Sequence, residues 1–144
     1  MSEPRSPRIF RFVDTKTGTF QIMAARKLVG SAVYGIYLFD SGTGWAKINT
    51  GTTQVSTGAD HVYAEIFSTQ TANYIIFVDG INKALAFNST TWYQLAAANA
   101  GGAGSPGGNQ IIDAPSAVTY FKSTVFLSGD INSPAVVSYS APDD

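Results

Sequence analysis

The chain contains no cysteine, and that absence excludes disulfides, cysteine zinc sites and cysteine nucleophiles. Charge is scarce as well: Asp, Glu, Lys and Arg make up 13% of the 144 residues, about half the roughly 25% of an average globular protein. His61 is the only histidine, and one histidine alone cannot build a histidine-based zinc site. These shortages remove most of the side chains that carry catalysis or bind metals.

Long apolar runs are also missing. No run approaches the roughly 18 residues of a membrane-spanning helix, so none is expected. The first residues carry no apolar segment of the kind that marks a secretory signal, and no signal peptide is predicted. No segment has a sustained helical period of about 3.6 residues, so we expect no helix.

Aromatic and β-branched residues are plentiful, and hydrophobic residues form 44% of the chain. They occur in short segments separated by Gly, Asp, Asn and Ser, a pattern that predicts an antiparallel all-β fold. We expect strands at residues 8–13, 19–25, 27–29, 32–39, 45–49, 61–67, 73–78, 83–87, 92–95, 117–121, 124–127 and 135–139. Residues 1–144 are predicted to form a single all-β domain, with an extended arm at residues 1–7 and a flexible Gly- and Ala-rich loop at residues 96–109.

Two segments, residues 37–48 and 85–95, resemble each other. Each has a short apolar strand, a polar turn and a strand that begins with Trp, and Trp45 and Trp92 are 47 positions apart (92 minus 45). A period of roughly 40–50 residues built from strands is typical of β-propeller blades. Residues 127–139 resemble residues 77–87, but this third unit ends before a Trp turn. The sequence therefore predicts a partial β-propeller of about two to three blade-like repeats, with the last repeat truncated.

The recurring aromatic residues are Phe39, Phe87 and Tyr139 before the turns and Trp45 and Trp92 after them. We interpret them as side chains that pack neighbouring blades together; the alternative is an aromatic platform for sugars or nucleic-acid bases. An incomplete ring leaves strand edges and apolar faces uncovered. We therefore expect a homo-oligomer that forms through the open sheet edges.

Charge is unevenly distributed along the chain. Residues 1–27 carry six basic residues against two acids, whereas the remainder has three lysines against eight acids. One reading is a basic arm that contacts nucleic acid or an acidic partner; the other is a solvated terminal strand with its turns.

No candidate catalytic group has a suitable companion. Asp79 and Asp130 occupy matching turns, so we expect them to bond their own backbone instead of forming the carboxylate pair of a glycosidase. Glu65 is in a predicted strand, and the Gly-rich residues 101–108 lack the Lys-Ser/Thr ending of a phosphate-binding loop. We predict that the protein is not an enzyme, with no catalytic, cofactor-binding or metal-binding residues and no cofactor.

The turn at residues 40–45 has the Asp, Gly and Trp spacing of an Asp-box, a turn of sialidase-type propellers. Leu38 replaces the expected Ser or Thr, and the corresponding turn at residues 88–92 is one residue shorter. Since an Asp-box is a folding element remote from catalysis, the similarity supports a propeller and not an enzyme.

Residues 122–130 and 133–142, which hold the strand ending Phe126-Leu127-Ser128-Gly129, resemble a blade of the β-propeller proteins in the tails of short-tailed bacteriophages. Residues 8–12 and 20–23 are similar to the paired N-terminal strands of tail nozzle and DNA-stabilisation proteins, and residues 77–80, 87–88 and Trp92 to their intervening blades. Those proteins are several hundred residues long, so the resemblance implies a fragment or a reduced relative.

The resemblance implies a non-enzymatic virion structural protein, made in the host cytoplasm, that forms a ring below the portal. The implied partners are other tail or portal proteins, with packaged DNA nearby but without sequence-specific contact. The alternative function is that of a carbohydrate-binding propeller or lectin-like module.

Overall fold

The computed structural model describes residues 8–27, 34–49, 61–95 and 113–140, and every regular element in these ranges is a β-strand. The predicted all-β, antiparallel fold is confirmed for this part of the chain. The predicted arm at residues 1–7, the loop at residues 96–109, the Gly-rich residues 101–108 and most of the expected strand at residues 27–29 lie outside the described residues.

Sheet 1 contains β1 (Arg8–Asp14), β2 (Thr19–Lys27), β3 (Tyr34–Asp40) and β4 (Gly44–Lys47), paired antiparallel in chain order. The turn between β1 and β2 is stabilised by Asp14, whose Oδ1 accepts hydrogen bonds from the Lys16 N at 3.0 Å and the Thr17 N at 3.4 Å. Such Asx turns bring the chain back at short range without a helix or long loop.

Sheet 2 contains β5 (Tyr63–Ser68), β6 (Asn73–Val78), β7 (Leu85–Phe87) and β8 (Trp92–Gln94), again in chain order. Sheet 3 contains β9 (Ala117–Phe121), β10 (Thr124–Ser128) and β11 (Ser138–Tyr139) in the same antiparallel order. The described residues therefore form three open meander sheets, one after another along the chain, and no closed ring.

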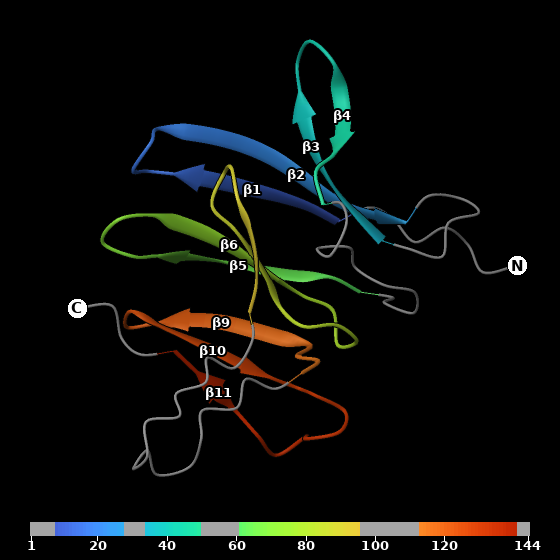
Figure 1. Cartoon of the computed structure of the whole chain (residues 1–144), viewed down its shortest axis with the longest axis vertical. Helices are drawn as coiled ribbons and strands as arrows, with labels where there is room; N and C mark the ends of the chain where they lie inside the picture. Colours follow the sequence, from blue (N-terminus) through green and yellow to red (C-terminus); the bar gives the residue numbers. More distant parts are fainter. Residues whose placement is uncertain (1–7, 28–33, 50–60, 96–112, 141–144) are drawn as a thin grey trace, which may run out of the picture.

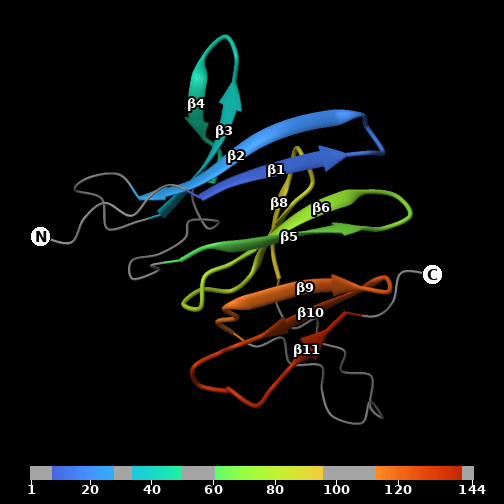
Figure 2. The ribbon, with the colours of Figure 1, turned by 180° about the vertical axis from the view of Figure 1, so that it is seen from behind.

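The three sheets lie in layers, with sheet 2 between the other two (Figures 1 and 2). This position explains why β6 is a continuous apolar run. Side chains alternate across a strand, so Ile75 and Phe77 enter a core shared with sheet 1, whereas Ile76 and Val78 enter a second core shared with sheet 3. Burying each such side chain contributes about 1.5–3 kcal/mol, so the middle sheet is stabilised from both sides.

Aromatic and polar contacts join the layers. Phe10 of sheet 1 meets Phe77 of sheet 2 edge to face, with 5.5 Å between ring centroids. The Trp92 Nε1 donates a hydrogen bond to the Ile48 carbonyl oxygen at 3.1 Å, and the Tyr120 hydroxyl donates to the Ser68 carbonyl oxygen at 3.2 Å. Each interface between sheets therefore has a specific polar bond in addition to apolar contact.

Several strands differ from the sequence prediction. The strand expected at residues 45–49 ends at Lys47, and the strand expected at residues 61–67 begins at Tyr63. The expected strand at residues 135–139 is reduced to β11, because the Val136 N donates to the Ser133 carbonyl oxygen at 3.0 Å in a turn and only Ser138 and Tyr139 pair with β10. The expected strand at residues 83–87 begins at Leu85. A search of the described residues for a helix able to cross a membrane finds none.

Candidate functional site

The two Trp turns that the sequence pairs also have matching geometry. Asp40 Oδ1 accepts hydrogen bonds from the Gly42 N at 2.9 Å and from the Thr43 N at 2.8 Å. Asn88 Oδ1 accepts from the Thr90 N at 3.3 Å and from the Thr91 N at 2.8 Å. One side-chain oxygen thus holds each turn, which explains why Asp and Asn are interchangeable at this position.

Each turn brings a Phe and a Trp directly opposite each other. Phe39 pairs with Trp45 across β3 and β4, and Phe87 pairs with Trp92 across β7 and β8, with centroid distances of 5.3 and 4.7 Å. Phe87 is buried between sheets 1 and 2, and Trp92 packs against that core. By contrast, Phe39 is 42% and Trp45 is 45% exposed.

The strand registers explain this difference. Tyr37 pairs with Ala24 in sheet 1, and Leu85 pairs with Phe77 in sheet 2. Tyr37 and Leu85 are equivalent, because each is two residues before the Phe of its turn. These positions share the face that carries the Phe and Trp of each turn, because residues two apart point the same way. In sheet 2 that face packs on sheet 1. In sheet 1 the corresponding face is the outer surface of the stack.

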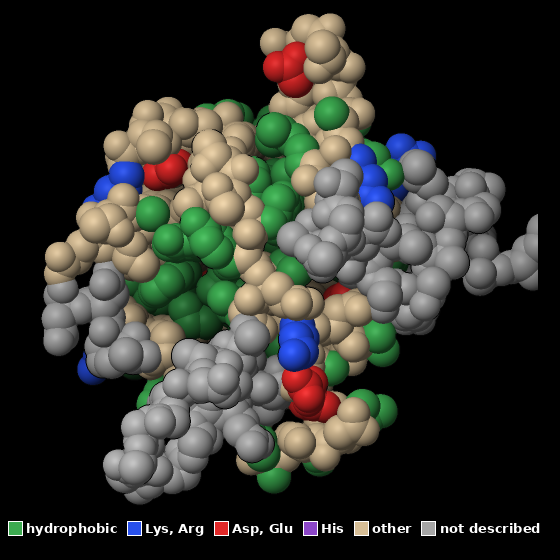
Figure 3. All heavy atoms as spheres, viewed as in Figure 1, with side chains coloured by type: hydrophobic (Ala, Val, Ile, Leu, Met, Phe, Trp, Pro, Cys, Tyr) green, Lys and Arg blue, Asp and Glu red, His purple; other side chains and the backbone are tan. Residues whose placement is uncertain are grey.

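This outer face of sheet 1 is our first candidate site, and we call it the head face. Four of its hydrophobic side chains are at least two-fifths exposed: Ile9, Phe20, Phe39 and Trp45. Arg11 is on the same face, with its guanidinium carbon 5.3 Å from the centroid of the Phe20 ring. On the side of the molecule seen in Figure 3, hydrophobic side chains gather over the middle of the stack and the β3–β4 hairpin rises above them.

The outer face of sheet 3, which we call the tail face, is aromatic as well. Tyr139 is 66% and Phe121 is 61% exposed. The Tyr139 ring lies beside Phe126, with 6.3 Å between centroids. Phe126 and Tyr139 pair across β10 and β11, and their neighbours Val125 and Leu127 point the other way, into the core with sheet 2.

The predicted equivalence of Tyr139 with Phe39 and Phe87 is therefore wrong by one residue. Ser138, and not Tyr139, is opposite Leu127, as Leu85 is opposite Phe77. Since a shift of one residue in a strand reverses the face, Tyr139 points away from sheet 2 where Phe87 points toward sheet 1.

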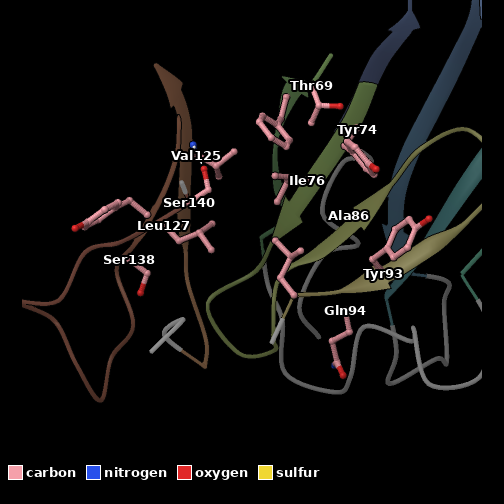
Figure 4. A pocket seen from close by; sticks show the side chains of 13 residues that line it. Thr69, Tyr74, Ile76, Ala86, Tyr93, Gln94, Val125, Leu127, Ser138 and Ser140 are labelled. Carbon is pink, nitrogen blue, oxygen red and sulfur yellow. Dashed lines mark hydrogen bonds between the residues drawn. The ribbon is translucent and has the colours of Figure 1, made fainter. Parts of the chain in front are cut away.

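A pocket of about 480 Å³ lies between sheets 2 and 3 and is our second candidate site. Figure 4 shows Tyr74, Ile76 and Tyr93 on one side and Val125 and Leu127 on the other. Its origin follows from the registers, because Ser138 and Ser140 occupy the positions that Leu85 and Phe87 hold in sheet 2. Two small side chains in place of two large ones leave space between the layers.

Three aspartates, Asp40, Asp79 and Asp130, serve as turn residues. As predicted, Asp79 bonds nearby backbone, with its Oδ1 accepting from the Ile81 N at 2.8 Å and the Asn82 N at 2.7 Å. Asp130 is buried, and its Oδ1 accepts from the Asn132 N at 2.8 Å. The hydrogen bond from the Thr43 backbone N–H, with further bonds from that residue's hydroxyl and from Gly42, lowers the pKa of Asp40.

Among the other described ionisable residues, Lys83 and Asp113 form an ion pair, with 3.6 Å between Nζ and Oδ1. Glu65 is exposed on β5, and His61 is exposed just before that strand, with its ring 6.5 Å from that of Tyr63. Within residues 8–27, 34–49, 61–95 and 113–140, no group of three His, Cys, Asp or Glu side chains is placed to hold a metal ion.

Sequence reasoning identified Phe39 and Trp45 but not their exposure, and it identified neither the tail face nor the pocket. Residue type alone does not tell a covered sheet face from an outer one. Comparison with protein-family models, with curated proteins and with solved structures finds no match to this chain.

Proposed function

We propose that this chain is a non-enzymatic structural protein that acts by association, and that its three sheets are consecutive blades of a partial β-propeller. The observation that carries the proposal is the head face. Its Phe39–Trp45 pair is exposed, whereas the matching Phe87–Trp92 pair packs between two sheets. An exposed apolar patch on the outer face of a sheet is typical of a site that binds another protein.

The propeller assignment is supported by three features of the described residues. All three sheets are antiparallel meanders in chain order. The Trp turns of sheets 1 and 2 are held by the same type of side-chain oxygen. Sheets 2 and 3 each pack on the preceding sheet with the same face, because Phe77 of sheet 2 and Leu127 of sheet 3 hold equivalent positions in the strand pairing. A blade cannot bury both faces alone, so neighbours must cover it.

The setting we propose is the tail of a short-tailed bacteriophage, because the blade sequences resemble those of tail nozzle and DNA-stabilisation proteins. The partners would be further copies of the chain and neighbouring tail or portal proteins, with packaged DNA nearby. Basic side chains on the strands of the head face, namely Arg11, Arg26 and Lys47, would make any contact with DNA through phosphates and therefore without sequence preference.

The test is to measure the chain in purified virus particles by quantitative mass spectrometry, against the portal protein as an internal standard. We expect a fixed copy number per particle that survives washing in high salt. If the chain is absent from particles, or varies freely between preparations, the virion role is wrong.

The pocket between sheets 2 and 3 favours one alternative, a carbohydrate-binding module. Tyr74 and Tyr93 lie in its wall with ring centroids 6.0 Å apart, and Gln94 and Ser138 add polar groups. Aromatic faces with a few polar groups are what a small-molecule site requires. A glycan array is the test, with Tyr93→Ala as the variant that removes the wall. Specific sugar binding that Tyr93→Ala abolishes would establish the alternative and contradict the structural role.

A further inference from the structure

We propose that the head face of one chain binds the tail face of a second copy, so that identical chains associate head to tail. This inference rests on the proposed function and names the partner and both contact surfaces. It follows from three observations: the equivalence of the faces, their exposed aromatic residues and the charge at the two ends of the stack.

Within the chain, each interface joins a sheet to the one before it, and the later sheet contributes the face that carries Phe77 in sheet 2 and Leu127 in sheet 3. The head face is the same face of sheet 1, with Ala24 at the corresponding register position. The tail face is the opposite side of sheet 3. The equivalent side carries Met23 in sheet 1 and Ile76 in sheet 2, and each of these side chains is buried against the following sheet. The molecule thus carries both halves of one kind of interface, one at each end.

The two faces also offer the side chains that such an interface needs. The head face exposes Phe39 and Trp45, and the tail face exposes Phe121 and Tyr139. Aromatic residues are enriched at protein interfaces because they bury a large area with few rotatable bonds. Within the chain, the contact of Phe67 with Tyr120 between sheets 2 and 3, at 5.4 Å between ring centroids, is an interface of this type.

Charge opposes a contact between two head faces. The strands of the head face carry three basic side chains, those of Arg11, Arg26 and Lys47. Beside the tail face lies one lysine, Lys122, with its Nζ 5.4 Å from the centroid of the Phe121 ring. Two head faces brought together would therefore repel each other more strongly than a head face and a tail face. Together with the equivalence of the faces, this makes a second copy presenting sheet 3 the occupant that the head face fits.

A contact between different faces of identical chains is heterologous, and it either closes into a ring or continues as a filament. This property gives a sharp test. Trp45→Arg blocks only the head face, and Tyr139→Arg blocks only the tail face. Each variant alone has no complete pair of faces, but a mixture has one, because the Trp45→Arg chain keeps its tail face and the Tyr139→Arg chain keeps its head face.

The measurement is sedimentation velocity over a wide concentration range, for the full chain and for both variants. We expect the wild-type protein to sediment at multiples of the 15.2 kDa chain mass. Each variant alone should be monomeric, with association weakened on the order of 30-fold or more, as for a central interface residue. The equimolar mixture should form a species of two chains and nothing larger.

The control variant is Ile131→Arg, which introduces the same charge at a side chain that is 82% exposed in a loop outside both faces. It should associate as the wild type does. Circular dichroism of every variant checks that the fold is kept, and a misfolded variant is replaced by Phe39→Arg or Phe121→Arg on the same face.

Three results would overturn the proposal. A monomeric wild-type protein excludes self-association. Association of one variant alone shows a contact between like faces, and a mixture that stays monomeric shows that the faces do not bind each other. Each of these outcomes is separate from the virion measurement, because a chain can be a constant part of particles while binding there to a different protein.

Discussion

The two tryptophans of the repeat provide the strongest test of how the sheets are held together, because equal substitutions at equivalent positions should have unequal effects. Trp92→Ala removes a ring that packs on the core between sheets 1 and 2 and a hydrogen bond from Nε1 to the Ile48 carbonyl oxygen. Trp45→Ala removes a ring that is 45% exposed and contacts Phe39.

The magnitudes follow from these contacts. Replacing a buried Trp by Ala costs 3–5 kcal/mol, and Trp92 is only partly buried, so about 3 kcal/mol is expected for packing. The lost hydrogen bond adds about 1 kcal/mol. Trp45 loses mainly its contact with Phe39, which is worth about 1 kcal/mol. The free energy of unfolding should therefore fall by about 3 kcal/mol more in Trp92→Ala than in Trp45→Ala, or roughly 6–12 °C in Tm.

The assay is urea unfolding followed by far-UV circular dichroism, since substitution of a tryptophan would alter a fluorescence signal. Both substitutions are made in the Tyr139→Arg chain, so that association does not contribute. A third variant, Trp92→Phe, keeps an aromatic ring without the N–H and should lose about 1 kcal/mol through the bond alone. Equal losses for Trp45→Ala and Trp92→Ala would refute the assignment of the two faces.

Three further predictions concern single polar or glycine positions. Burial acts to raise the pKa of Asp14, but hydrogen bonds from Thr17, Lys16 and Ser89 outweigh it, and the pKa is lowered from its ordinary value. The stability that Asp14 contributes is complete above the pKa of the unfolded chain and is lost as the pH falls through the folded pKa. Asp14→Asn should therefore flatten the acid limb of stability measured by urea unfolding. Gly129→Ala should destabilise by more than the roughly 1 kcal/mol of Gly18→Ala in thermal melts, because both glycines have positive φ but the new Cβ at Gly129 meets the Ser116 Oγ whereas Gly18 faces open space. Asn49→Ala should cost about 1–3 kcal/mol in urea unfolding, because the Ile36 N donates at 2.6 Å to the buried Asn49 Oδ1 and would be left without an acceptor.

Much of the fold was predictable because the local signals were strong. The run at residues 73–78 predicts a strand, and β6 has those bounds in the middle sheet. The turn residues Asp14, Asp40 and Asn88 mark hairpins whose backbone they bond. These features depend on residues close in sequence, so a single chain is enough to identify them.

The candidate sites depend on long-range register, which sequence pattern specifies weakly. Tyr139 follows an apolar pair, Val136 and Val137, that predicts a longer strand than β11. Val136 belongs to the turn at Ser133, and neither Val136 nor Val137 pairs with β10. The pairing of Tyr139 with Phe126 then decides which face of the sheet Tyr139 occupies. In the same way, only the pairing of Ser138 with Leu127 reveals that serines stand where sheet 2 has Leu85 and Phe87.

The arrangement of the sheets finally links stability to assembly. Three stacked sheets share two interfaces, so the end sheets each bury one face where the middle sheet buries two. Head-to-tail closure of two copies would give six sheets six interfaces, and the gain would depend on protein concentration by mass action. A substitution at Trp92 should lower stability equally at every concentration, whereas one at Trp45 in the otherwise wild-type chain should lower it more as concentration rises. Substitution of the two equivalent tryptophans therefore tests two different properties, folding at Trp92 and assembly at Trp45.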